Sequence, residues 1–332
     1  MIICFPHKPG SGGPGSFQRR FEQELKDIGW EVVYKGTKIK PDLIFVVGGT
    51  RHIFWLLRMK MRGVPVLYRL DGISWLHRKK KVGIKHFLIA EYRNMLGKII
   101  HAFIADIIVY QSNFVQNWWN KAGYRKRKNP SIIYNGVILP RNTTIGTLNG
   151  KQNLLVLEGN IDYSPYAVRL LNELASKLGD KIDIDLYGNF ELTANKNKLA
   201  QTINYHGFLP RENVNDAMFG SIYLSLDINP ACPNTVIEAL ACGAPVVAFD
   251  TGSLKELVPE DAGIIVPYGS DPWQLAYPDV DALVAAILKV KENYAWYSAN
   301  ARKVAEERYS IEGMTEKYLK IIRNFLNRSI EK

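Results

Sequence analysis

Short apolar runs alternate with segments of helical periodicity along the first part of the chain. The runs are MIICF (1–5), EVVY (31–34), DLIFVV (42–47), VPVLYRL (64–70) and DIIVYQS (106–112). Between the first two runs, apolar residues share one helical face over 16–29, with Ser16 as the expected N-cap and Gly29 as the stop. A second helix is expected over 52–63. Continuous apolar strands that alternate with helices predict a parallel sheet covered on both faces.

A second series of the same kind follows a polar segment, PRNTTIGTLNGKQN (140–153), which is typical of an inter-domain linker. Its predicted strands are LLVLEG (154–159), IDIDLYG (182–188), YLSLDI (223–228) and PVVAFD (245–250), and its predicted helices span 167–179, 234–243 and 281–294. The pattern predicts an α/β protein of two tandem Rossmann-like, doubly wound domains. Ligands are expected at the carboxyl ends of the strands, in an inter-domain cleft.

Composition changes this picture in two ways. Three cysteines, Cys4, Cys232 and Cys242, are too few and too scattered for a disulfide framework, and no apolar run reaches the length of a membrane span, so we expect a cytoplasmic protein. The charge is uneven: residues 1–150 contain 25 Lys and Arg against 8 Asp and Glu, and the remainder contains 18 against 24. The excess of positive charge therefore lies entirely in the first half.

The loop GSGGPG (10–15) follows a strand and opens a helix, which is the setting of a dinucleotide-binding turn. Such a site also needs an acidic residue at the end of the second strand, where this chain has Tyr34 and Lys35. An NAD-dependent oxidoreductase is therefore the weaker alternative. Gly12, Gly13 and Gly15 still allow close approach of a phosphate to the backbone, although a tight turn without a ligand has the same sequence.

The segment NPACPNTVIEALACG (229–243) contains a glutamate with two possible roles. Thr235 and Glu238 have the spacing of a capping box. Alternatively, the helix N-terminus binds an anion, and the Glu238 carboxylate one turn later accepts both hydroxyls of a ribose. The second role indicates a nucleotide ligand.

Several segments in order resemble the retaining, family-four glycosyltransferases, a group of GT-B proteins with two Rossmann-like domains. They are GGPGSF (12–17), IIYNGV (132–137), HGFLPRENV (206–214), IEALACGAPVVAFDTGSLKELV (237–258) and KVAEERYSIEGMTEKY (303–318). The resemblance implies an acceptor-side domain over 1–148, a nucleotide-sugar domain over 149–312, and a C-terminal helix over 313–332 that crosses back onto the first domain. It also implies a hinge for closure over the donor.

The same resemblance implies the site residues. The diphosphate would be held by the amides of Asn234, Thr235 and Val236, with help from the glycine loop, and Glu238 would bind the ribose. Gly207 and Phe208 would flank the base, and Gly159 and Asn160 would line the donor site. Asp71 would stand at the catalytic position where the family often has a histidine near the reacting sugar; it could bind a sugar hydroxyl there or simply end its strand. No metal and no cofactor are implied.

Two positions depart from the family pattern. Pro230 stands where a carboxylate near the donor sugar is expected, eight residues before Glu238, and Asn229 or Asp227 could substitute for it. Asn160 stands where many members have an arginine on the diphosphate. A non-catalytic relative that binds nucleotide-sugar or supports a partner enzyme therefore remains an alternative.

The expected function is transfer of a sugar from a nucleotide-sugar, UDP-linked in preference to GDP-linked, to a glycan or lipid-linked acceptor. The basic segments of the first half, such as HRKKKVGIKHF (77–87), mix Lys and Arg with aromatic residues, a composition typical of segments on an anionic membrane surface. A solvated basic face has the same composition. Nucleic acid is disfavoured as a partner, because no nucleic-acid-binding motif accompanies the charge.

Overall fold

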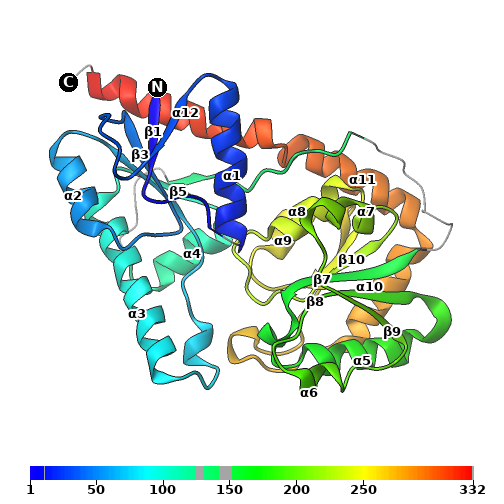
Figure 1. The fold of residues 1–332 in the computed structure, drawn as a ribbon. Coiled ribbons are helices and arrows are strands. Elements are labelled where there is room, and N and C mark those ends of the chain that lie inside the picture. Colours follow the sequence, from blue (N-terminus) through cyan, green and yellow to red (C-terminus); the bar gives the residue numbers. More distant parts are fainter. Residues whose placement is uncertain (11, 125–129, 142–151, 331–332) are drawn as a thin grey trace. The chain divides into compact units, whose positions relative to one another are not determined.

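The computed structural model describes residues 1–10, 12–124, 130–141 and 152–330. The chain divides into two compact units: Met1–Gly136 with Ile311–Lys332, and Val137–Ser310. The expected domain boundary at 148 and most of the expected linker lie outside the described residues. The helix expected near 313 begins at Ile311 and forms part of the first unit (Figure 1).

The first unit contains a parallel sheet of order β2-β1-β3-β4-β5-β6. Its strands are β1 (Ile2–Phe5), β2 (Glu31–Tyr34), β3 (Leu43–Val47), β4 (Val66–Leu70), β5 (Ile107–Tyr110) and β6 (Ser131–Ile132). Its α-helices are α1 (Gly12–Asp27), α2 (Ile53–Met61), α3 (Ile84–Ile99), α4 (Asn113–Lys121) and α12 (Ile311–Ile330). The five apolar runs of the first series thus correspond to the first five strands.

Side chains alternate between the two faces of this sheet, as the pleat requires. Ile3 and Phe5 join a core with Phe17 and Phe21 of α1 and Tyr318 of α12. The Tyr318 ring centroid lies 5.1 Å from that of Phe21, so α12 is anchored by aromatic packing on the face that α1 covers.

The second unit contains a parallel sheet of order β12-β11-β10-β7-β8-β9. Its strands are β7 (Asn153–Asn160), β8 (Asp183–Asn189), β9 (Ile203–Gly207), β10 (Ile222–Ser225), β11 (Val246–Phe249) and β12 (Gly263–Val266). Its helices are α5 (Ala167–Leu178), α6 (Thr193–Lys196), α7 (Val214–Met218), α8 (Asn234–Ala241), α9 (Leu254–Leu257), α10 (Val280–Glu292) and α11 (Tyr294–Arg308). Two all-parallel sheets covered by helices confirm the predicted α/β fold class.

The expected cap at Ser16 is wrong. The helix α1 begins four residues earlier, at Gly12, whose φ of +78° permits the sharp entry. Ser16 lies inside the helix and is 4% exposed. In the described parts of the chain, no helix has the length and apolar content needed to cross a membrane.

Candidate donor site

The strand order of the second unit creates a switch point between β7 and β10. The chain proceeds from β7 through α5 to β8 on one side, and from β10 through α8 to β11 on the other. In open parallel sheets, ligands bind where the order reverses, outside the carboxyl ends of the strands. A ligand is therefore expected at the segments that follow these two strands.

The helix α8 presents an N-terminus at this edge. Its N-cap is Pro233, which has no side chain able to cap, so the first N–H groups, at Asn234, Thr235 and Val236, belong to an end without a side-chain cap. Thr235 lies inside α8, two residues after this N-cap. The capping-box interpretation of Thr235 is therefore wrong, because a residue inside the helix cannot be its N-cap.

Glu238 lies one turn into α8, with its side chain 14% exposed. Arg211 donates from Nη2 to Glu238 Oε1 at 3.3 Å, while the Arg211 side chain itself is 58% exposed. At the other end of α8, Arg302 donates from Nη1 to the carbonyl of Ala241 at 2.6 Å. A cation there complements the negative end of the helix dipole. The positive end, at the N-terminus of α8, is the one that favours an anion.

Pro230 has a structural role in the loop after β10. A Cβ at Gly252, whose φ is +61°, would lie 2.4 Å from Pro230 Cδ, so the two segments touch through their backbones. The Pro230 carbonyl accepts a hydrogen bond from the Ser253 N–H at 3.0 Å. A carboxylate at position 230 would have to project from a residue already packed on this turn.

Asn229 precedes it with φ of +53° and is 5% exposed. Its backbone N–H donates to Thr251 Oγ1 at 3.3 Å, but its side-chain Nδ2 is buried without a partner among the described residues. An unpaired buried donor costs about 1–3 kcal/mol, which a ligand oxygen or a water would recover.

A pair of carboxyl groups occupies the switch point. Glu158 lies near the end of β7, Asp227 follows β10, and the Leu226 N–H donates to Glu158 Oε1 at 3.3 Å. Burial raises the pKa of Asp227 to about 6. Burial, and then the nearby Asp227 charge, raise the pKa of Glu158 well above its usual range. The sequence analysis named Asp227 as a possible substitute for the missing carboxylate at position 230, but it did not identify Glu158. The sequence indicates Glu158 only as a carboxylate at the end of a predicted strand, before Gly159.

We expect Asp227→Asn to raise stability at pH 7.5 by about 2–3 kcal/mol, with the gap vanishing near pH 4. The pKa of Asp227 is raised in the folded state from 3.8 to about 6, so the folded state loses stability as pH rises through that window. The amide cannot ionise and escapes this loss. Urea unfolding of both proteins from pH 4 to pH 8 measures it. The exposed Asp180→Asn is the control, and a gap independent of pH would contradict the assignment.

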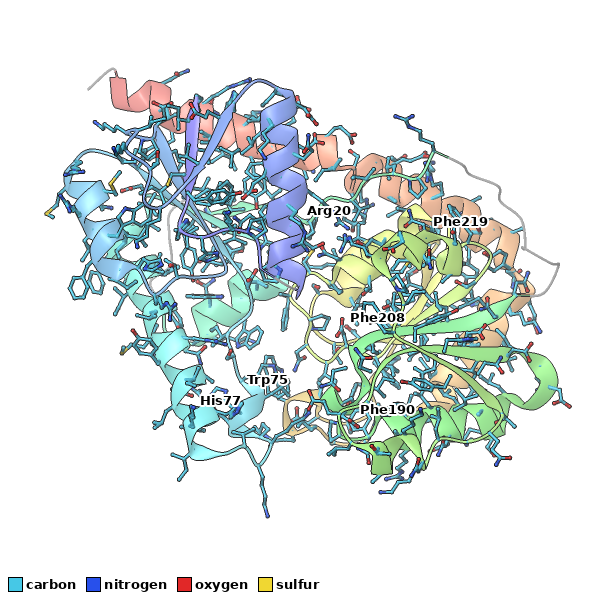
Figure 2. The ribbon with its side chains drawn as sticks, in the orientation of Figure 1. Arg20, Trp75, His77, Phe190, Phe208 and Phe219 are labelled. Carbon is cyan, nitrogen blue, oxygen red and sulfur yellow. The ribbon has the colours of Figure 1, made fainter. Side chains whose placement is uncertain are left out.

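The other predicted donor residues lie at the same carboxyl edge of the sheet. Gly159 lies near the end of β7, in an irregular pairing with β8, and Gly207 ends β9 with φ of +75°. Phe208, labelled in Figure 2, follows Gly207 and is 69% exposed. Asn160 accepts from the Asp162 N–H at 2.9 Å and donates to Glu191 Oε1 at 2.6 Å, so this side chain caps a short 3₁₀ turn.

The glycine loop belongs to the first unit. Gly12 and Gly13 open α1, and a Cβ on Gly15 would lie 1.9 Å from the Gly10 carbonyl oxygen. Arg19 Nη1 donates to that same oxygen at 2.8 Å. The last glycine is thus required by close packing of the loop on its own helix, which the sequence alone could not distinguish from phosphate binding.

Asp71, also in the first unit, follows β4 in a buried polar network. Arg69, 1% exposed in its side chain, donates from Nη1 to Asp71 Oδ1 at 2.7 Å, and Gln111 Nε2 donates to the same oxygen. Arg69 also donates from Nη2 to Asn135 Oδ1 at 2.5 Å and lies 3.9 Å above the Phe17 ring. Burial raises the pKa of Asp71, while Arg69 and Gln111 oppose the rise.

The second oxygen of Asp71 faces the turn after β3. A Cβ at Gly48, whose φ is +67°, would lie 2.2 Å from Asp71 Oδ2. Glycine at this position therefore makes room for the carboxylate. Elsewhere, the described residues contain no group of three His, Cys, Asp or Glu side chains suited to holding a metal ion.

Comparison with known proteins agrees with this arrangement. The family model of the glycosyl transferases group 1 matches residues 153–293, which span the donor-site segments of the second unit. An uncharacterized glycosyltransferase of Haemophilus influenzae is 26% identical over 297 residues, covering 86% of this chain and 77% of the relative.

Solved structures share the fold over almost the whole chain. Anabaena HepE in complex with UDP matches with a TM-score of 0.72 and 16% identity, covering 97% of this chain and 99% of that one. WaaG, a glycosyltransferase involved in lipopolysaccharide biosynthesis, matches with a TM-score of 0.68 and 17% identity over 97% and 99% of the two chains. The second unit thus contains a segment that matches the glycosyl transferases group 1, and the chain has the GT-B fold of these solved structures.

Proposed function

We propose that the protein transfers a sugar from a nucleotide-sugar, with UDP-sugars preferred, to a hydroxyl of a glycan or lipid-linked acceptor, with retention of configuration. The proposal rests on two features of α8. Its N-cap residue makes no side-chain capping bond, and the partly buried Glu238 lies one turn into the helix. Support comes from HepE, whose structures hold UDP, UDP with glucose, and UDP-glucose.

In this proposal the second unit binds the donor. The amides of Asn234, Thr235 and Val236 receive the diphosphate, Glu238 accepts from the ribose hydroxyls, and the backbone around Gly207 and Phe208 contacts the base. A helix N-terminus stabilises the charge that develops on the leaving diphosphate, so the reaction needs neither a bound metal nor a covalent protein nucleophile.

The sugar lies at the switch point in this proposal. The buried Nδ2 of Asn229 donates to a sugar hydroxyl, and the carboxyl pair of Glu158 and Asp227 accepts from others. These groups replace the carboxylate missing at position 230.

The first unit holds the acceptor. Because Arg69 and Gln111 both donate to Asp71 Oδ1, we propose that Oδ2 accepts a hydrogen bond from a sugar hydroxyl. The network fixes the carboxylate before the ligand arrives, which reduces the entropy lost on binding. The glycine loop of residues 12–15 supplies further N–H groups for phosphate.

A screen of UDP-, GDP- and ADP-glucose by thermal shift and donor hydrolysis tests the proposal. A ligand at one hundred times its Kd stabilises the folded state by about 2.7 kcal/mol. Binding without turnover, with or without candidate acceptors, would favour the non-catalytic relative. A shift with NADH and none with any nucleotide-sugar would overturn the donor site and revive the oxidoreductase.

We further propose that the helix α3 rests on an anionic membrane. Ile84, Leu88, Tyr92 and Met95 are spaced as one helical stripe and are 81%, 61%, 51% and 48% exposed. Only Leu96 and Gly97 of this helix are buried. An apolar stripe of this kind on a globular surface indicates an interaction site.

The charge around α3 supports an anionic partner. Lys79, Lys80 and Lys81 precede the helix, and Lys85, Arg93 and Lys98 lie on it. The acidic Glu91 is bonded by Arg78 Nε at 2.5 Å and by His77 at 2.6 Å, which together hold its pKa near 2. His77 and Trp75 are labelled beside this helix in Figure 2. Basic residues flanking an apolar stripe match an anionic lipid surface.

We expect Leu88→Glu to reduce binding to vesicles containing anionic lipid by at least tenfold, because burying a charge among acyl chains is unfavourable. Co-sedimentation with vesicles of phosphatidylcholine and phosphatidylglycerol measures it. Leu192→Glu, at a leucine of the second unit that is 58% exposed, is the matched control. Equal loss in both variants, or equal binding to pure phosphatidylcholine, would contradict the proposal.

A further inference from the structure

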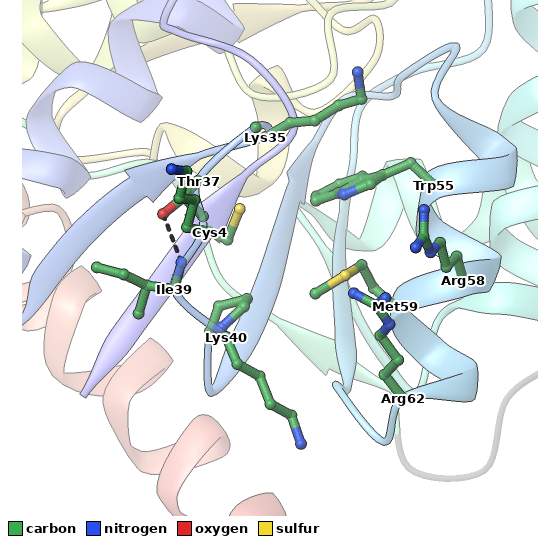
Figure 3. Close-up of a pocket in the computed structure, with 12 residues that line it drawn as sticks. Cys4, Lys35, Thr37, Ile39, Lys40, Trp55, Arg58, Met59 and Arg62 are labelled. Carbon is green, nitrogen blue, oxygen red and sulfur yellow. Dashed lines mark hydrogen bonds between the residues drawn. The ribbon is translucent and has the colours of Figure 1, made fainter.

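A hollow of about 730 Å³ lies in the first unit, between β1, the connection from β2 to β3, and α2 (Figure 3). The residues around it are Cys4, Lys35, Gly36, Thr37, Lys38, Ile39, Lys40, Pro41, Trp55, Arg58, Met59 and Arg62. None of them belongs to the donor site.

The hollow exists because a crossover helix is absent between β2 and β3. Parallel strands are ordinarily joined by a dozen or more residues that include a helix, but here residues 35–42 alone connect them. Ile3 and Phe5 face α1 and α12, so Cys4, between them, faces the opposite side of the sheet. The face of β1 that such a helix would cover instead forms the floor of the cavity.

The rim of the hollow is strongly cationic. Lys35, Lys38, Lys40, Arg58 and Arg62 all line it, the lining includes no acidic residue, and none of the five pairs with a carboxylate of the described chain. Five like charges around one space repel one another, and an anion in that space would relieve the repulsion.

The neighbouring carboxylates are engaged elsewhere. Asp42 accepts from the Ile2 N–H at 2.7 Å, and Asp106 pairs with Lys60 of α2 at 2.6 Å. Besides burial, Lys35 and Arg51 lower the pKa of His52, at the start of α2. These carboxylates therefore do not neutralise the cationic rim by pairing with it.

Apolar side chains come from three elements around the hollow. Trp55 and Met59 line it from α2, Ile39 and Pro41 belong to the connection, and Cys4 belongs to β1. Figure 3 shows Trp55 and Met59 across the hollow from Cys4. Burial raises the pKa of Cys4 to about 11, so its thiol is neutral at physiological pH and acts as an apolar group. A ligand that fills this space therefore combines an anionic head with a less polar part.

We propose that this cavity binds a phosphate-bearing ligand, either a lipid headgroup or a soluble phosphate ester. Guanidinium groups on one wall favour a phosphate, because a planar fork of donors matches its oxygens. The lysines of the connection close the opposite wall, and Trp55 packs on the carbon skeleton of the ligand. The site lies wholly within the first unit and does not depend on the donor assigned to the second.

Isothermal titration with inorganic phosphate, sn-glycerol 3-phosphate and dihexanoyl phosphatidic acid below its micelle concentration tests the proposal. We expect the double variant Lys38→Glu/Arg58→Glu to weaken binding at least tenfold. Both side chains are exposed, so the fold should persist, which circular dichroism checks. The matched control, Lys317→Glu/Lys320→Glu, makes the same change of charge on α12, which packs on the other face of the sheet.

If the phosphatidic acid binds most tightly, the proposal is supported and the ligand is a lipid headgroup. If glycerol phosphate binds equally or more tightly, the proposal is supported and the ligand is a soluble phosphate ester. Trp55→Ala should weaken the phosphatidic acid more than inorganic phosphate. Equal loss in the control variant, or no binding of any probe at millimolar concentration, would overturn the site. Donor hydrolysis should be unchanged in the cavity variant, so failure here is distinct from failure of the proposed function.

Discussion

Glu238→Gln should lower kcat/KM for the nucleotide-sugar about 100-fold while leaving the free energy of unfolding nearly unchanged. A carboxylate that accepts from two ribose hydroxyls contributes about 1.5–3 kcal/mol for each charged hydrogen bond, and the amide replaces only part of this. Thr235 and Glu238 do not form a capping box, because the N-cap of α8 is Pro233.

Parallel measurement of donor kinetics and urea unfolding separates the two roles. If Glu238 were a capping residue, its substitution would reduce the free energy of unfolding by about 1 kcal/mol and leave the kinetics unchanged, which is the opposite pattern. The exposed Glu260→Gln, on the surface of the same unit, is the control for a lost negative charge. If Glu238→Gln retained full kcat/KM, the ribose assignment would be wrong.

Arg69→Ala should reduce the free energy of unfolding by about 3–5 kcal/mol. The change removes the cation 3.9 Å from the Phe17 ring and leaves the Asp71 carboxylate without its charged partner. Breaking one side of a buried ion pair costs far more than the pair itself contributes, because the remaining charge stays desolvated. Urea denaturation followed by circular dichroism measures the loss.

Two further variants make this prediction specific. Arg78→Ala breaks an ion pair of 2.5 Å with Glu91, but the Arg78 side chain is 55% exposed, so we expect a cost below about 1 kcal/mol. The double variant Arg69→Met/Asp71→Leu removes both charges of the pair, of which Arg69 is 1% and Asp71 24% exposed, and should recover much of the loss. Similar losses for Arg69→Ala and Arg78→Ala would contradict the burial argument.

Hydrophobic patterning located most strands well. EVVY coincides with β2, and DLIFVV and PVVAFD each contain one buried strand, because a strand covered on both faces is an uninterrupted apolar run. The strands β6, β9 and β12 were not predicted, and neither were the helices α3, α4, α6, α7, α9 and α11. The helix α3 is exposed along most of its length, so no core imposes a clear apolar face on its sequence.

Local chemistry assigned two N-caps wrongly. Ser16 and Thr235 are both favourable N-cap residues, yet both lie inside helices that begin earlier, at Gly12 and Asn234. Capping preferences are worth about 1 kcal/mol, and the packing of a whole helix on its sheet outweighs them. Because Thr235 is not the N-cap, it cannot form a capping box with Glu238. Ligand binding therefore remains the proposed role of Glu238.

By itself the sequence determined the alternation of strands and helices, the two parallel sheets and the segment that carries the donor-site motif, since these follow from short-range periodicity and local spacing. Only the tertiary structure decided which distant residues meet. The carboxyl groups of Glu158 and Asp227 lie close together because β7 and β10 are neighbours in the sheet order. The cationic hollow exists because a short connection leaves one face of β1 uncovered. Both depend on strand order, which long-range packing sets and local sequence does not encode.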